Sequence, residues 1–172
     1  MNRSKRSVVL ALGNDILGDD AVGFHAARRL RWDFAAGVDI VESGEAGLAL
    51  LDHLEGYDRA IILDAIATGK CAPGTVLIWG PEDFRKQVAP SPHFSGLPEI
   101  LSLAERVGMH FPKDMRVIAM EVHDPTVFGD TLSSQAKAAL PAFVAAARRI
   151  LAEEWGHKPR SEQENAPCTS TP

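Results

Sequence analysis

Three carboxylates lie within six residues near the start of the chain, in the stretch GNDILGDDAVG at positions 13–23. They are Asp15, Asp19 and Asp20, and they follow the apolar run VVLALG at 8–13, which is typical of a strand. Charges of one sign at this spacing repel one another unless a cation joins them. The last two also open a predicted helix, whose dipole favours a carboxylate by about 0.3–1 kcal/mol each. A cation site and a helix start therefore both explain the acids.

Other acids stand at or near the ends of later predicted strands, and these are Glu42, Asp64 and Glu121. In an open parallel sheet the strand ends share one edge, and ligands bind outside the carboxyl ends of the strands. We therefore expect these acids to meet Asp20 there, although each alone could be a solvated strand-end residue. An acid directly after the apolar run AIIL, as at Asp64, is an unusual choice for a core strand.

His93 is the candidate third ligand. It stands in the segment APSPHFSGLPEI, on a loop that could fold over the strand ends, although a lone loop histidine is often only a surface group. Two carboxylates and an imidazole suit a borderline divalent cation such as zinc or nickel. The predicted metal ligands are Asp20, Asp64 and His93, and three ligands leave coordination positions open. His123 is a weaker candidate.

Several common chemistries are not indicated. The glycines at 13, 18 and 23 lack the GxGxxG spacing, and no GxxxxGK[ST] sequence is present, so a nucleotide-binding loop is not predicted. An acidic turn would also repel a phosphate at the helix start. There is no GxSxG elbow and no HExxH helix, and neither Ser95 nor Cys71 has an evident activating base.

Apolar strand-like runs alternate with helical spacing, which predicts an α/β fold. About ten Gly- and Pro-rich residues separate two of these runs, too few for a parallel crossover, so the strand at 75–80 should be antiparallel and near an edge. We expect a three-layer α/β/α sandwich with a mostly parallel, five-stranded twisted sheet. The predicted strands are 8–13, 38–42, 60–65, 75–80 and 115–122. The predicted helices are 20–34, 47–54, 97–107 and a last one beginning near Ser133, which Pro141 either bends or starts. A long loop is predicted at 81–96.

A length of 172 residues fits one domain, which we place at 1–155, followed by a disordered polar tail at 156–172. The net charge of −5 argues against nucleic acid and anionic membranes as partners. Two distant cysteines indicate a reducing compartment, and the first apolar run is too short for an export signal, so the cytoplasm is expected. A monomer is the default expectation.

Three motifs resemble those of the nickel-iron hydrogenase maturation endopeptidases. The first is residues 13–23, which resemble the family's Gly-Asn-x-Leu-x-x-Asp-(Asp/Glu)-x-x-Gly after a strand. The second is the segment ILDAIATGKCAPGTV, which resembles the family's strand-Asp-Ala followed by a Pro-Gly-Thr turn. The third is the segment SPHFSGL, which resembles the family's Ser-x-His-x-x-(Gly)-Leu loop. The resemblance covers most of residues 8–152. Where the family commonly has Asp-Gly-Gly-Thr, this chain has ESGE at 42–45, which points to a different partner hydrogenase or a changed role there.

The resemblance implies an α/β sandwich whose metal-contacting residues are Asp20, Asp64 and His93. It implies an endopeptidase that removes the C-terminal extension of a hydrogenase large-subunit precursor once nickel is in place beside a Cys-x-x-Cys pair. The nickel would come with the substrate, so no permanent cofactor is expected. The attacking group would be a water, which a carboxylate could assist as a base in an aspartyl endopeptidase-like mechanism, or a carboxylate could itself be the nucleophile. Glu42 is a tentative catalytic residue.

Two alternatives stay open. The same residues could serve a non-catalytic nickel-site checkpoint or metallochaperone, which would leave the precursor intact. The chain could instead be a zinc-holding hydrolase or binding module, and a stoichiometric metal that survives dialysis would then be expected.

Overall fold

The strands form where β-branched and other apolar residues run almost without interruption, because both faces of this sheet are covered. The computed structural model describes residues 5–34, 37–80, 83, 91, 93 and 97–160. Within these residues the strands are β1 (Ser7–Leu12), β2 (Val38–Ser43), β3 (Arg59–Ile66), β4 (Val76–Trp79) and β5 (Asp114–Glu121). The helices are α1 (Val22–Asp33), α2 (Leu50–Leu54), α4 (Leu97–Arg106) and α5 (Ser134–Arg149), with short turns η1 (Gly18–Ala21), η2 (Gly47–Ala49) and η3 (Ile150–Glu154).

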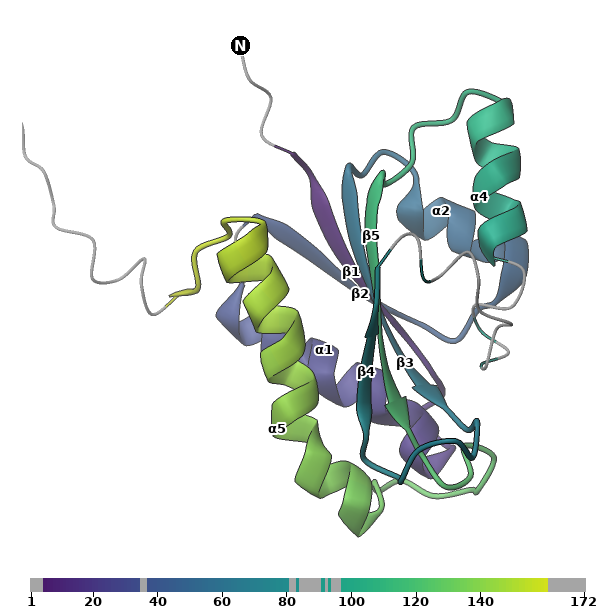
Figure 1. Cartoon of the computed structure of the whole chain (residues 1–172), viewed down its shortest axis with the longest axis vertical. Coiled ribbons are helices and arrows are strands. Elements are labelled where there is room, and N and C mark those ends of the chain that lie inside the picture. Colours follow the sequence, from purple (N-terminus) through teal and green to yellow (C-terminus); the bar gives the residue numbers. More distant parts are fainter. Residues whose placement is uncertain are drawn as a thin grey trace, which may run out of the picture.

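The described strands form a five-stranded sheet in the order β2-β1-β3-β5-β4. The pairs β1–β2, β1–β3 and β3–β5 are parallel, whereas β4 is antiparallel to β5 and lies at an edge. This confirms the predicted sheet and its antiparallel edge strand. In Figure 1, α1 and α5 lie on one side of the sheet, and α2 and α4 lie on the other, which makes the three layers.

The strand order reverses at β1. From β1 the chain moves outward to β2, and it then returns past β1 to form β3 on the other side. The carboxyl ends of β1 and β3 are therefore neighbours, with Ala11 paired with Leu63 near those ends. Ligands of open α/β sheets bind at such a reversal, because the two connections leave in different directions and open a space between them.

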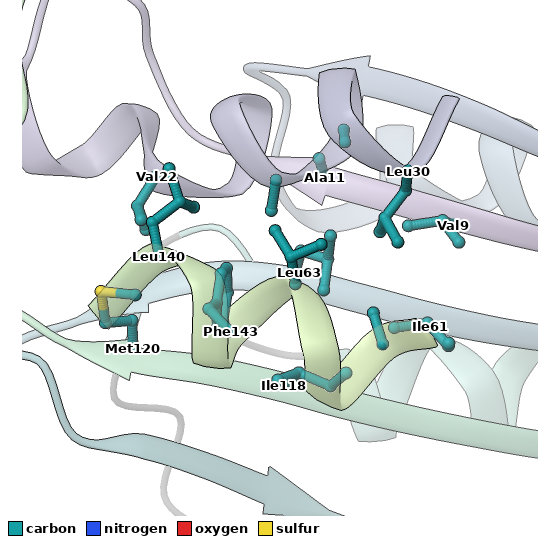
Figure 2. Close-up of a cluster of buried hydrophobic side chains, with 14 of the residues drawn as sticks. Val9, Ala11, Val22, Leu30, Ile61, Leu63, Ile118, Met120, Leu140 and Phe143 are labelled. Carbon is teal, nitrogen blue, oxygen red and sulfur yellow. The ribbon is translucent and has the colours of Figure 1, made fainter. Parts of the chain in front are cut away.

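The larger part of the core lies between the sheet and the pair α1 and α5. Figure 2 shows Leu140 and Phe143 of α5 beside strand residues such as Leu63 and Ile118, and all four are buried. A second cluster on the other face contains Leu50 and Leu54 of α2 with the alternate residues of the same strands. The two clusters fix which face each strand residue points to, and this decides where polar residues at the strand ends lie.

The first helix differs from the sequence expectation at its start, and the last helix begins where the sequence predicts. The helix predicted at 20–34 begins as the tight turn η1, so Asp20 lies in that turn and α1 starts at Val22. The last helix begins after Ser133, whose Oγ accepts a hydrogen bond from the N–H of Ala136, as predicted for an N-cap. Pro141 lies inside this helix and does not start it; it is exposed, so the carbonyl that it leaves unpaired can bond to water.

Two segments of the sequence expectation fall largely outside the described residues. Of the long loop predicted at 81–96, only residues 83, 91 and 93 are described. Of the polar segment from 156, residues 156–160 are described, and Nε2 of His157 lies 2.8 Å from Oγ of Ser7 at the start of β1. None of the described helices combines the length and the apolar character that crossing a bilayer needs.

Candidate metal-binding active site

The chain turns over the ends of β1 and β3 immediately after β1, and two glycines allow this. Gly13 has φ +147°, and a Cβ there would collide with the carbonyl oxygen of Asp20. A Cβ on Gly23 would lie 2.7 Å from the carbonyl oxygen of Leu12 and 2.9 Å from that of Leu63. Backbone can therefore pack directly on backbone, and η1 brings Asp20 to the strand ends.

Asp20, Asp64 and His93 meet at this reversal of the sheet, as the sequence predicts. Each offers one ligand atom, and the three atoms all lie within 4.8 Å of one another. Nε2 of His93 is 3.4 Å from Oδ2 of Asp20. Both carboxylates are buried and the His93 side chain is only 14% exposed, so the three side chains form a largely desolvated cluster.

Asp64 points away from the α1 and α5 layer. Its neighbours Leu63 and Ala65 belong to that core, so the alternation of the strand turns Asp64 to the other face, toward the segment that carries His93. The Ser91 hydroxyl donates a hydrogen bond of 2.5 Å to Oδ2 of Asp64, and the Ala65 N–H donates one of 2.8 Å to Oδ1. Both oxygens of the buried carboxylate therefore have fixed donors.

Ser91 and the carbonyl of Glu45 orient the imidazole. The backbone N–H of His93 donates to Oγ of Ser91 at 3.2 Å, and Nδ1 of His93 lies 3.4 Å from the carbonyl oxygen of Glu45. Nδ1 can share a proton with that carbonyl, which directs Nε2 toward the carboxylates. There Nε2 donates to Asp20 when the imidazole is protonated and offers a lone pair to a cation when the imidazole is neutral. Ser91 had no role of its own in the sequence-based prediction; its signal was that it is the serine of the Ser-x-His motif, two residues before the candidate ligand.

The protonation of the cluster reflects its burial. Removal from water raises the pKa of Asp64 to about 7, and the nearby Asp20 adds to this, whereas the Ser91 hydrogen bond and the His93 charge oppose it. The hydrogen bond with Asp20 raises the pKa of His93 above its usual value. The metal-free cluster therefore retains protons at neutral pH, and a bound cation would displace them.

The donor set fits a divalent cation. Two ionised carboxylates balance the charge of a doubly charged ion, and the imidazole is a favourable ligand for zinc and nickel. Three protein ligands leave further positions for groups from elsewhere. Among the described residues this is the one group of at least three histidine, cysteine or acidic side chains with such geometry.

Glu42 does not join this cluster. Its carboxylate forms ion pairs with Arg28 at 2.8 Å and with Arg31 at 2.9 Å, and both arginines belong to α1. It therefore faces the α1 side of the sheet, whereas Asp64 faces the other side. The tentative catalytic role of Glu42 stays a prediction.

The remaining acids of the sequence analysis hold loops in place. Glu121 is buried and accepts hydrogen bonds from the N–H groups of Thr68 and Gly69 and from the Thr68 hydroxyl, at 2.7–2.8 Å. Asp19 accepts a hydrogen bond of 2.6 Å from the N–H of Ser133, and Asp15 pairs with an α1 arginine. The acids expected at the strand ends thus divide into two candidate ligands and a set that fastens the surrounding segments.

The comparisons with known proteins point to one family. Residues 25–150 match the sequence model of the family HycI, described as hydrogenase maturation protease, and this range contains Asp64 and His93 and begins after Asp20. The hydrogenase expression/formation protein HupD of Rhizobium leguminosarum bv. viciae is 30% identical over 156 residues, which is 88% of this chain and 76% of that protein. The hydrogenase 2 maturation protease of Escherichia coli (strain K12) is 36% identical over 121 residues, 67% of this chain and 72% of that protein.

Solved structures agree with this. The hydrogenase maturating endopeptidase HybD from E. coli superposes with a TM-score of 0.77 at 29% identity, covering 91% of this chain and 99% of that one. The [NiFe] hydrogenase maturation protease HybD from Thermococcus kodakarensis has a TM-score of 0.66 at 28% identity, covering 84% and 98%.

Proposed function

Because the chain belongs to the hydrogenase maturation protease family and is therefore a peptidase, we propose that it removes the C-terminal extension of a nickel-iron hydrogenase large-subunit precursor after nickel insertion. One observation carries the proposal. Asp20, Asp64 and His93 come from three separate segments, yet their ligand atoms lie within 4.8 Å of one another. Such a cluster has the shape of a coordination sphere with positions left for the substrate.

In this proposal the nickel arrives as part of the substrate. The precursor's cysteines hold it on one side, and Asp20, Asp64 and His93 approach it from the other. The two carboxylates balance the charge of the nickel. A nickel-free precursor brings no cation to balance the carboxylates. Docking of a nickel-free precursor would leave desolvated acids without a counter-charge, and this cost favours the loaded substrate.

Hydrolysis of the scissile peptide consumes one water. A new C–O bond forms at the scissile carbonyl, the C–N bond breaks, and the leaving amine takes up a proton. The attacking oxygen belongs to that water directly, or to a carboxylate whose acyl intermediate the water then releases. Both routes need ionised Asp20 and Asp64, and both need the peptide held still, for which the substrate's metal acts as an anchor.

The test is a cleavage assay on purified precursor with and without nickel, read by gel shift and by mass spectrometry of the C-terminus. We expect cleavage of the nickel-loaded form only, and loss of cleavage in Asp20→Asn, Asp64→Asn and His93→Ala. Asp39→Asn and His110→Gln are matched controls, because these exposed residues lie in other ion pairs. Equal cleavage of the nickel-free precursor, or persistent cleavage in all three site variants, would refute the proposal.

The same assay, together with metal analysis of the purified protein, separates the alternative functions of the site. A nickel-dependent complex that leaves the precursor intact would indicate a checkpoint or metallochaperone. A stoichiometric zinc that survives dialysis would indicate a zinc-holding hydrolase. Glu42→Gln tests the tentative catalytic residue: loss of cleavage with unchanged binding of the loaded precursor would establish its role.

A further inference from the structure

Three large apolar side chains stand exposed on two loops beside the metal-binding cluster. Phe128 is 80% exposed, Ile16 60% and Val127 56%. Single exposed apolar residues are ordinary on protein surfaces, but a group of them on adjoining segments marks a surface for interaction. We call Ile16, Val127 and Phe128 the apolar ridge.

The two loops of the apolar ridge are fastened to each other. The N–H of Gly129 donates to the carbonyl of Ile16 at 3.0 Å, and the N–H of Gly18 donates to the carbonyl of Gly129 at 2.8 Å. These bonds flank an isolated parallel bridge between Leu17 and Gly129. Residues more than 100 positions apart in the chain are thus held as one unit, so binding there would cost little ordering of the protein.

The apolar ridge is joined directly to the metal-binding cluster. The N–H of Asp20 donates to the carbonyl of Leu17, the residue that follows Ile16. On the other side of the ridge, the N–H of Ser133 donates to the carboxylate of Asp19, the neighbour of Asp20. The ridge and the cluster therefore lie on segments that adjoin in the fold, so that a polypeptide bound at the cluster can extend over the ridge.

We propose that the apolar ridge binds apolar side chains of the precursor segment that adjoins its nickel-binding cysteines. The inference rests on the proposed function and adds a second contact to it, one that does not involve the metal. Three protein ligands on a substrate-held ion give position but little contact area, whereas each large apolar side chain that becomes buried adds favourable free energy to the binding. The ridge places this area next to the ligands, so that the metal decides selectivity and the ridge strengthens binding of either form.

The test uses the full-length chain with Phe128→Ser, Ile16→Ser and the double variant. Leu103→Ser, on α4, and Val107→Ser, directly after α4, are matched controls, because these apolar residues are also exposed but do not belong to the two loops of the ridge. We measure the Kd of the nickel-loaded precursor, the Kd of Ni²⁺ alone, and kcat and KM for cleavage.

The double variant should bind the loaded precursor about 10- to 30-fold more weakly, with KM raised and kcat within about twofold of wild type. Its Kd for Ni²⁺ alone and its melting temperature should not change, and the controls should bind the precursor like wild type. Phe128→Leu should keep most of the affinity. Affinity for the nickel-free precursor should fall by the same factor, because the ridge does not contact the metal.

Unchanged precursor affinity in the folded double variant would overturn the inference, as would an equal loss in the α4 controls. A weakened Kd for Ni²⁺ alone would also overturn it, because the ridge would then act through the cluster. Failure of the proposed function gives a different result, because the Asp20, Asp64 and His93 variants would then cleave the precursor normally. The Kd of the precursor for the ridge variants does not depend on cleavage, so it tests the ridge separately.

Discussion

The Ser91 hydroxyl donates its hydrogen to Oδ2 of Asp64, and both residues are buried. The same oxygen of Ser91 accepts the backbone N–H of His93. One hydroxyl therefore ties two of the three candidate metal ligands together, and it stabilises the ionised form of a carboxylate that burial disfavours. Ser91 is thus a positioning residue whose effect should be visible in a pH profile.

Ser91→Ala should weaken the binding of Ni²⁺ about tenfold near pH 6.5, with a smaller loss at pH 8.5. The pKa of Asp64, already raised to about 7 by burial, should rise further without the hydroxyl, so more of the carboxyl is protonated at the lower pH. Calorimetric titration with Ni²⁺ at both pH values checks this. Ser102→Ala, on α4, is the control, and an equal loss at both pH values would contradict a role through the Asp64 proton.

Asp64→Asn should stabilise the metal-free protein above pH 7 while it abolishes cleavage. The folded pKa of Asp64 is about 7 and the unfolded value is 3.8, so the unfolded chain releases this proton first. Stability therefore falls as pH rises from about 4 to about 7, and it stays lower above that range. Asn avoids this loss, which amounts to about 1–4 kcal/mol.

Urea unfolding of wild type and Asp64→Asn at pH 4 and pH 8 measures this difference. The two curves should differ most at pH 8, in favour of the variant. A variant less stable than wild type at pH 8 would show that the carboxylate is needed for the fold rather than for a site.

Much of the fold follows from the sequence because hydrophobic periodicity is a local signal. The strands predicted at 8–13, 60–65 and 115–122 are present as β1, β3 and β5, with bounds within one residue of the prediction. The short connection before β4 correctly predicted that this strand is antiparallel. Asp20 and Asp64 could be named as candidate ligands because parallel strand ends meet at one edge. His93 was named from its loop, and its motif agreed, but no local pattern fixes how a loop lies over the sheet.

The remaining acids show where such reasoning ends. Glu42 and Glu121 stand near strand ends as Asp64 does, but side-chain direction and partners separate them. Glu42 meets the arginines of α1, and Glu121 accepts three hydrogen bonds from Thr68 and Gly69. These partners depend on packing between distant segments, which one sequence does not reveal.

Gly13→Ala should impair both stability and cleavage, because the added Cβ would displace the backbone that carries Asp20. We expect a loss of about 2–4 kcal/mol in the free energy of unfolding, since a forced backbone shift adds to the strain of the positive φ. Gly69→Ala is the matched control: it has φ +68° and nothing within 4 Å, so it bears only the conformational cost of about 1 kcal/mol. Urea unfolding and the precursor assay check both variants, and equal effects would contradict the close packing at Gly13.

Binding of Ni²⁺ should release protons near neutral pH. The pKa values of Asp64 and His93 are both raised in the metal-free protein, the first by burial and the second by its hydrogen bond with Asp20, so both groups carry protons that a cation must displace. Titration calorimetry in buffers of different ionisation enthalpy counts the released protons. We expect between one and two at pH 6.5 and fewer at pH 8.5, so the affinity should rise with pH over this range. In His93→Ala the count at pH 6.5 should fall, because one of the two proton carriers is gone. A count that is zero at both pH values would mean that the ion binds elsewhere.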